Sequence, residues 1–127
     1  MKTNLAKKEG ISAIEQLSAM VVESMLEKKA EEVISMDLSH LDDAITDRII
    51  ICEANSTRQV QAIADNILLN VKKELLDLPS HVEGMNNGEW ILIDYFNLIV
   101  HVFLREKRAF YQIEDLWSDA LTVEHEG

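Results

Sequence analysis

The sequence contains few of the residues that cross-link a chain or interrupt its helices and strands. Its 127 residues include one cysteine, one proline and four glycines, and aromatic residues make up only 6%. A single cysteine, Cys52, excludes an internal disulfide framework and fits a reducing compartment. Scarce glycine argues against a phosphate-binding loop, and the chain contains neither a G-x-G-x-x-G nor a Walker-type motif. The fold must therefore be held together by packing.

Long apolar runs are also missing. No stretch approaches the roughly 18 residues that a membrane span requires. The lysines near the start are not followed by the apolar core of a signal peptide. We therefore expect a soluble, cytoplasmic protein without a membrane partner. The length predicts a single domain over residues 1–127, since single cores usually run from about 100 to 200 residues.

Basic residues are outnumbered by acidic ones. Twelve Lys and Arg stand against 23 Asp and Glu, giving a formal net charge of −11. A protein that binds nucleic acid normally carries a basic face, because counterion release from phosphates drives the affinity. The surplus of carboxylates opposes direct, sequence-specific binding to nucleic acid. It favours a basic protein as the partner.

Periodic apolar residues predict the helices and strands. Capping-box sequences at 12–15 and 56–59 precede residues at helical spacing, so we expect one helix over 12–29 and a second that reaches Leu75 and closes before Pro79. Alternating or β-branched runs predict strands at 33–38, 48–52, 81–84, 90–95 and 98–104. From residue 105 we expect short helical pieces and an acidic tail from about 118. This order predicts an α/β (α+β) fold, with a mixed β-sheet of about five strands flanked by helices.

The two strands at 90–95 and 98–104 are expected to form a hairpin that turns at Phe96-Asn97. This register places Tyr95 opposite Leu98, Asp94 opposite Ile99, Leu92 opposite His101 and Trp90 opposite Phe103. Because side chains alternate along a strand, the two faces separate cleanly. One face carries Trp90, Leu92, Asp94, Ile99, His101 and Phe103. The other, expected to face the core, carries Ile91, Ile93, Tyr95, Leu98, Val100 and Val102.

Asp94 and His101 would lie diagonally across this hairpin, within reach of each other. A carboxylate there would raise the affinity of the imidazole for a proton, as in half of a catalytic dyad. The pattern places no Ser or Cys nucleophile nearby, so a structural or interfacial pair is favoured and no enzyme is predicted. The histidines show no metal-ligand spacing, and no metal or cofactor is expected. Cys52, in an apolar strand, is interpreted as inert packing.

The segment from Arg108 to Trp117 concentrates aromatic residues with an arginine, the types enriched at binding hot spots. Some of its apolar residues would simply pack a terminal helix onto the sheet. Trp90, Tyr111 and Trp117 are the aromatic residues that we expect to contact a partner.

Stretches matching one family occur in order along nearly the whole chain. They include Thr46-Asp47-Arg48-Ile49-Ile50-Ile51-Cys52, Asn55-Ser56, Glu89-Trp90-Ile91-Leu92-Ile93-Asp94-Tyr95, Val100-His101-Val102-Phe103 and Arg108-Ala109-Phe110-Tyr111-Gln112-Ile113-Glu114-Asp115-Leu116-Trp117. Together these resemble the ribosomal silencing factor family, also called the Iojap family. Three positions depart from its usual pattern: Arg48, Ala54 and Phe96. Because phenylalanine tolerates positive φ poorly, we expect Asn97 to take any left-handed position in the turn.

The resemblance implies a topology related to nucleotidyltransferases without their catalytic carboxylates, and no D-x-D follows from Asp37. It implies a translational repressor that binds the large ribosomal subunit through its L-fourteen-type protein and sterically blocks small-subunit joining. It places Trp90 and its sheet face on the ribosome-facing surface. We extend that surface to Asp94, His101, Arg108, Tyr111 and Trp117. The alternatives are an assembly or dimerisation module without inhibitory role and an enzyme using Asp94 and His101. A homodimer of the free protein stays open.

Overall fold

The computed structural model, which describes residues 12–111 and 120–126, is built on one open six-stranded sheet. The strands lie in the order β3-β4-β5-β2-β1-β6, and the central pair β2–β5 is parallel while the other pairs are antiparallel. The mixed sheet flanked by helices is confirmed. In chain order the elements are α1 (Ala13–Glu27), β1 (Glu31–Asp37), β2 (Arg48–Ala54), α2 (Thr57–Leu75), β3 (His81–Glu83), β4 (Trp90–Asp94), β5 (Leu98–Leu104), α3 (Arg105–Tyr111) and β6 (Leu121–His125).

The two long helices begin where the capping sequences predict. The Ser12 hydroxyl accepts the N–H of Glu15 at 3.2 Å, and the Ser56 hydroxyl accepts the N–H of Gln59 at 3.1 Å. In a full capping box the third-position side chain would bond back to the cap. Here the Gln59 amide instead donates to the carbonyls of Lys28 and Lys29 at 3.2 and 3.3 Å. The caps start the helices, and the side chains that follow tie them to other segments.

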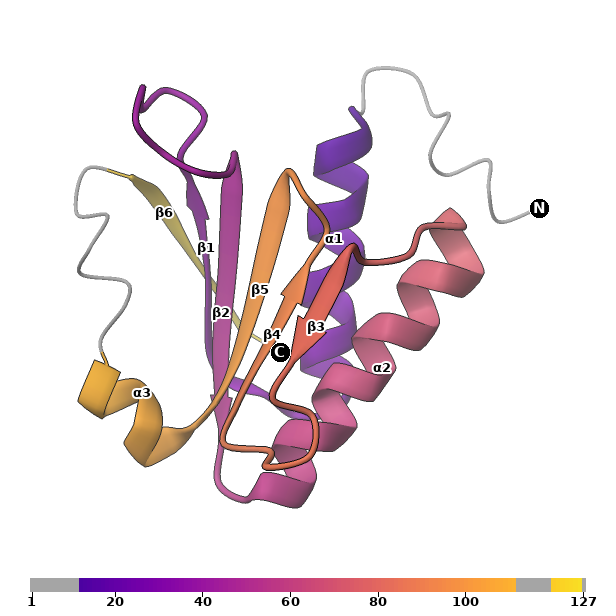
Figure 1. The fold of residues 1–127 in the computed structure, drawn as a ribbon, viewed down its shortest axis with the longest axis vertical. Coiled ribbons are helices and arrows are strands. Elements are labelled where there is room, and N and C mark those ends of the chain that lie inside the picture. The colour runs from indigo at the N-terminus through magenta and orange to yellow at the C-terminus, as the bar shows by residue number, and fades with distance from the viewer. Residues whose placement is uncertain (1–11, 112–119, 127) are drawn as a thin grey trace.

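Both long helices cover the same face of the sheet, and the main core lies between them and the strands (Figure 1). The predicted core side of the hairpin is confirmed, because its six residues are all 6% exposed or less. Cys52 is fully buried in this core, and burial raises the pKa of its thiol. A buried, protonated thiol is the inert packing group that the sequence indicates.

The hairpin has the predicted register, with Trp90 opposite Phe103, Leu92 opposite His101 and Asp94 opposite Ile99. The turn itself differs, because Phe96 and not Asn97 has the positive φ, at 81°. The Phe96 N–H donates to Asp94 Oδ1 at 2.7 Å, and the Phe96 carbonyl accepts from Thr46 Oγ1 at 3.2 Å. These two hydrogen bonds, one from the N–H and one to the carbonyl of Phe96, hold a backbone conformation that phenylalanine alone disfavours.

The C-terminal part differs from the expectation of helical pieces followed by a tail. Helix α3 is present, but Leu121–His125 forms a sixth strand, β6, which pairs antiparallel with β1 at the sheet edge. Its five residues do alternate, with apolar Leu121 and Val123 beside polar side chains, but so short a run next to Glu124 and Glu126 also fits a solvated tail. Within the ranges described above, no helix is both long and apolar enough to cross a membrane.

Candidate functional site

The candidate site is the face of β4 and β5 that points away from α1 and α2. Those helices lie on the other face of the sheet. The short helix α3 lies on the same face as the candidate site, beyond the C-terminal end of β5 (Figure 1). Four residues on this face are partly exposed: Trp90, Leu92, Asp94 and Ile99. Between and beneath them, His101 is 8% exposed and Phe103 is fully buried. The face therefore combines a half-open apolar surface with a buried aromatic base.

Trp90 is held in place by two buried neighbours. Its indole N–H donates to Nδ1 of His101 at 3.0 Å, and its ring stacks on Phe103 with a centroid separation of 4.9 Å. Since Nδ1 accepts this bond, the imidazole is neutral and its proton lies on Nε2. Burial lowers the pKa of His101 to about 4, which keeps the ring neutral at ordinary pH. Trp90 is thus a fixed, partly exposed aromatic group.

The predicted Asp94–His101 pairing is wrong. The Asp94 carboxylate accepts the N–H of Phe96 in the turn, whereas His101 accepts the indole of Trp90. The pKa of His101 moves down because of desolvation, opposite to the rise expected beside a carboxylate. The diagonal register was correct, but each side chain has a nearer partner. The enzyme hypothesis therefore loses the pair on which it rested.

One end of this face is bordered by the segment between β1 and β2. Leu38, Leu41 and Ala44 from this segment pack with Phe103 in a second, smaller core. The adjoining Ile45 is 80% exposed. Phe96, 83% exposed, lies at the same end, because Thr46 donates to its carbonyl. Our sequence-based choice of contacts missed these exposed apolar side chains, although an isoleucine and a phenylalanine in predicted loops were a usable signal.

Arg108 is not displayed on this surface. It is 7% exposed, its Nη1 donates to the carbonyl of Glu32 at 2.6 Å, and it lies 3.4 Å from the Glu53 carboxylate. Its guanidinium is therefore committed inside the chain, which corrects the expectation that it faces a partner. Tyr111 ends helix α3, but its side chain lies outside what the structure describes, as does Trp117.

Among the described residues, no group of three His, Cys, Asp or Glu side chains could hold a metal ion. His81 and Glu83 meet on β3, with Nε2 and Oε2 2.5 Å apart. Both side chains are more than half exposed, so this is a surface pair.

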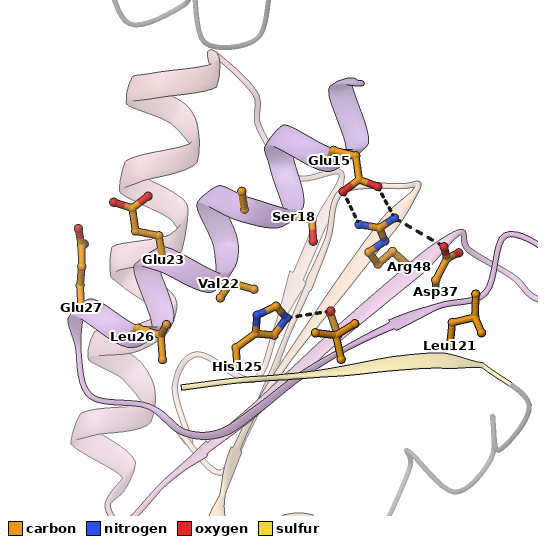
Figure 2. Close-up of a pocket in the computed structure, with 13 residues that line it drawn as sticks. Glu15, Ser18, Val22, Glu23, Leu26, Glu27, Asp37, Arg48, Leu121 and His125 are labelled. Atoms are coloured by element: carbon orange, nitrogen blue, oxygen red, sulfur yellow. Dashed lines mark hydrogen bonds and ion pairs between the residues drawn. The ribbon is translucent and has the colours of Figure 1, made fainter. Parts of the chain in front are cut away.

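A second feature lies on the opposite face, where β6 extends the sheet beyond α1. Figure 2 shows the groove between α1 and the β1–β6 edge, which has a volume of about 890 Å³. At one end Arg48 contacts the carboxylates of Glu15 at 3.0 Å and Asp37 at 3.8 Å. The hydrogen bond from Arg48 lowers the pKa of Glu15. This groove was not expected, because β6 was not predicted.

Comparison with known proteins assigns the fold to a family. The family model described as "Ribosomal silencing factor during starvation" matches residues 11–127. The ribosomal silencing factor RsfS of Halalkalibacterium halodurans is 37% identical over 113 residues, covering 89% of this chain and 95% of that protein. A crystal structure of a Chromobacterium violaceum protein superposes with a TM-score of 0.78 at 32% identity, covering 90% of this chain and 93% of the other.

A more distant relative carries a different name. The "Mitochondrial assembly of ribosomal large subunit protein 1" of Mus musculus is 30% identical over 76 residues, which cover 58% of this chain and 33% of that protein. The match of the family model to nearly the whole chain is decisive. The chain belongs to the ribosomal silencing factor family, a family of ribosome-associated regulators of translation.

Proposed function

We propose that this protein is a cytoplasmic translational repressor that binds the large ribosomal subunit through its L-fourteen-type protein. Bound there, it sterically blocks joining of the small subunit and carries out no catalysis. The observation that carries the proposal is the fixed, half-exposed Trp90 on an open sheet face in a chain of this family. Tryptophan is a frequent hot-spot residue, and a pre-positioned ring loses little entropy on binding.

Charge and shape support a protein as the partner. The net charge of −11 suits a basic ribosomal protein and opposes bare RNA. The open face offers Leu92 and Ile99 beside Trp90, and the exposed Ile45 and Phe96 extend it toward one end. A stable interface needs roughly 800 Å² on each partner, so the contact must extend beyond these two strands to the exposed Ile45 and Phe96 and their surroundings.

The proposal is tested by subunit joining. Purified protein is added to isolated large subunits, small subunits follow, and joining is measured by light scattering and sedimentation. We expect the protein to sediment with the large subunit and the joined particle to diminish. Stable binding with unchanged joining would contradict the occlusion mechanism.

The contact face needs a variant that spares the fold. Trp90→Ala would leave the buried acceptor of His101 unsatisfied and a gap over Phe103, so it mixes stability with binding. Leu92→Lys puts a charge into the half-exposed patch without removing those contacts. We expect it to weaken large-subunit binding by about tenfold or more, which is about 1.4 kcal/mol. Leu69→Lys, at a 61% exposed position of α2 on the other face, is the matched control.

An assembly role is the second candidate, favoured by the name of the mouse relative, which refers to assembly of the mitochondrial large subunit. It uses the same surface and predicts binding to the large subunit without an effect on joining. The joining experiment therefore separates the two functions, because both predict binding and only the repressor predicts fewer joined particles.

A further inference from the structure

The groove between α1 and β6 is left open by the way the helices cover the sheet. A sheet of six strands is about 24 Å wide at about 4.8 Å per spacing. Two helices packed about 10 Å apart cover most of that width, but not all of it. Helix α2 lies over β4, β5 and β2, and α1 lies over β2, β1 and β5. Within residues 12–111 and 120–126, neither long helix lies over the edge strand β6.

The uncovered edge presents apolar side chains. Leu121 is 63% exposed and Val123 is 54% exposed, and both line the groove. The facing wall is α1, which contributes Val22, Leu26 and Ala19. Figure 2 shows Val22 and Leu26 on the α1 side and Leu121 on the strand side of this space. A helix laid beside α1 would bury both walls at once, as α1 itself does beside α2.

The rim of the groove is acidic. Glu15, Glu23, Glu27 and Asp37 line it against one arginine, Arg48, which already contacts two of these carboxylates. Asn66 and Asn70 of α2 donate to Glu27 at 2.9 and 3.1 Å, so this carboxylate is fixed between α1 and α2, at the margin of the groove. A negative rim repels nucleic-acid phosphates and anionic lipid headgroups. It also disfavours a second copy of a chain whose net charge is −11.

We propose that this groove binds an amphipathic helix of a partner protein, with an apolar stripe against Val22, Leu26 and Val123 and with lysines or arginines along its flanks. The occupant adds a third helix to the layer formed by α2 and α1. Helix-in-groove recognition uses this combination of apolar anchors and flanking charge. The site lies on the opposite face of the sheet from Trp90, so it is independent of the proposed ribosome contact.

The probe is a synthetic peptide of about 15 residues, made of leucine and lysine with the leucines on one helical stripe. A second peptide of the same composition has its leucines spread around the helix and keeps the same charge. Each is titrated into the full-length, ¹⁵N-labelled protein. We expect the amphipathic peptide to bind at least tenfold more tightly. Its chemical-shift changes should concentrate on α1, β1 and β6.

Two variants with matched controls locate the binding. Val123→Ser removes an exposed apolar contact of β6, and its control is Leu69→Ser on α2. Glu23→Lys reverses an exposed charge of the groove without touching β6, and its control is Asp65→Lys on α2. We expect each groove variant to lower the affinity for the amphipathic peptide at least fivefold. Each control should change that affinity less than twofold.

Three results would overturn the proposal. Equal affinity for the two peptides would mean that only charge attracts them. Shifts centred on Trp90 and β4 would move the site to the other face. A concentration-dependent dimer that excludes the peptide and disappears in Val123→Ser and Glu23→Lys would assign the groove to a second copy of this chain.

Discussion

His101 links the stability of the open face to pH. Its neutral ring accepts the indole proton of Trp90, and burial holds the pKa at about 4 against an ordinary value of about 6.5. Above pH 6.5 neither the folded nor the unfolded state protonates this ring. Between pH 6.5 and 4 the unfolded state takes up the proton first, so folding becomes less favourable as the pH falls.

We therefore expect the free energy of unfolding to fall by on the order of 3 kcal/mol between pH 7 and pH 4 through this residue. Urea unfolding at a series of pH values measures it. His101→Asn keeps an acceptor for Trp90 but does not titrate, so its curve should be flatter over this range. The lowered pKa values of Glu15 and Asp37 also reduce stability as the pH falls through and below their ordinary values of 4.5 and 3.8, but this loss is common to both proteins. Parallel curves would show that His101 is not the titrating group.

At the scale of elements, ion pairs between side chains attach the short helix α3 to the sheet. The Glu53 carboxylate, on β2, accepts a hydrogen bond from Arg105 Nε at 2.7 Å and lies 3.4 Å from Arg108 Nη1. Arg105 also forms an ion pair with Glu31. Glu53 and Arg108 are almost fully buried, at 8% and 7% exposure. A buried ion pair adds little over an apolar packing, but removing one member leaves an uncompensated charge.

Glu53→Gln is expected to lower the free energy of unfolding by about 3 kcal/mol, because it removes the buried negative charge that contacts the buried Arg108. The control is Glu89→Gln, which breaks the exposed Glu89–Lys107 pair at 3.7 Å and should cost less than about 1 kcal/mol. Chemical denaturation of both variants checks this. Similar small losses in the two would mean that α3 is anchored mainly by other contacts.

At the scale of the whole molecule, the net charge predicts that ribosomal protein, and not ribosomal RNA, supplies most of the binding affinity. A net charge of −11 opposes the approach of RNA phosphates at long range. We expect deproteinised large-subunit RNA, at concentrations matching the intact subunit, to leave binding to the intact subunit unchanged in a competition sedimentation assay. Effective competition by that RNA would contradict a protein contact as the source of affinity.

Local patterns decided a large part of this structure. Cap residues placed the starts of α1 and α2, and alternation with a two-residue turn placed the β4–β5 register and its core side. These signals are local, since they depend on sterics and hydrogen bonds over a few neighbouring residues. The ordered family stretches indicated the family that the comparisons confirmed.

Other features depend on which distant side chains meet. The sequence allows His101 to pair with either Asp94 or Trp90. In the folded protein it pairs with Trp90, because Trp90, His101 and Phe103 pack together as an aromatic stack. Arg108 looked like a surface hot spot, but Glu53, 55 positions away, draws it inside. Strand β6 is weak by itself and exists through its pairing with β1, which also creates the groove. The sequence by itself determined the two long helices, the strands other than β6, the hairpin faces and the family. Only the tertiary structure decided which polar groups are satisfied internally and which surfaces remain open, because both depend on contacts between residues far apart in the chain.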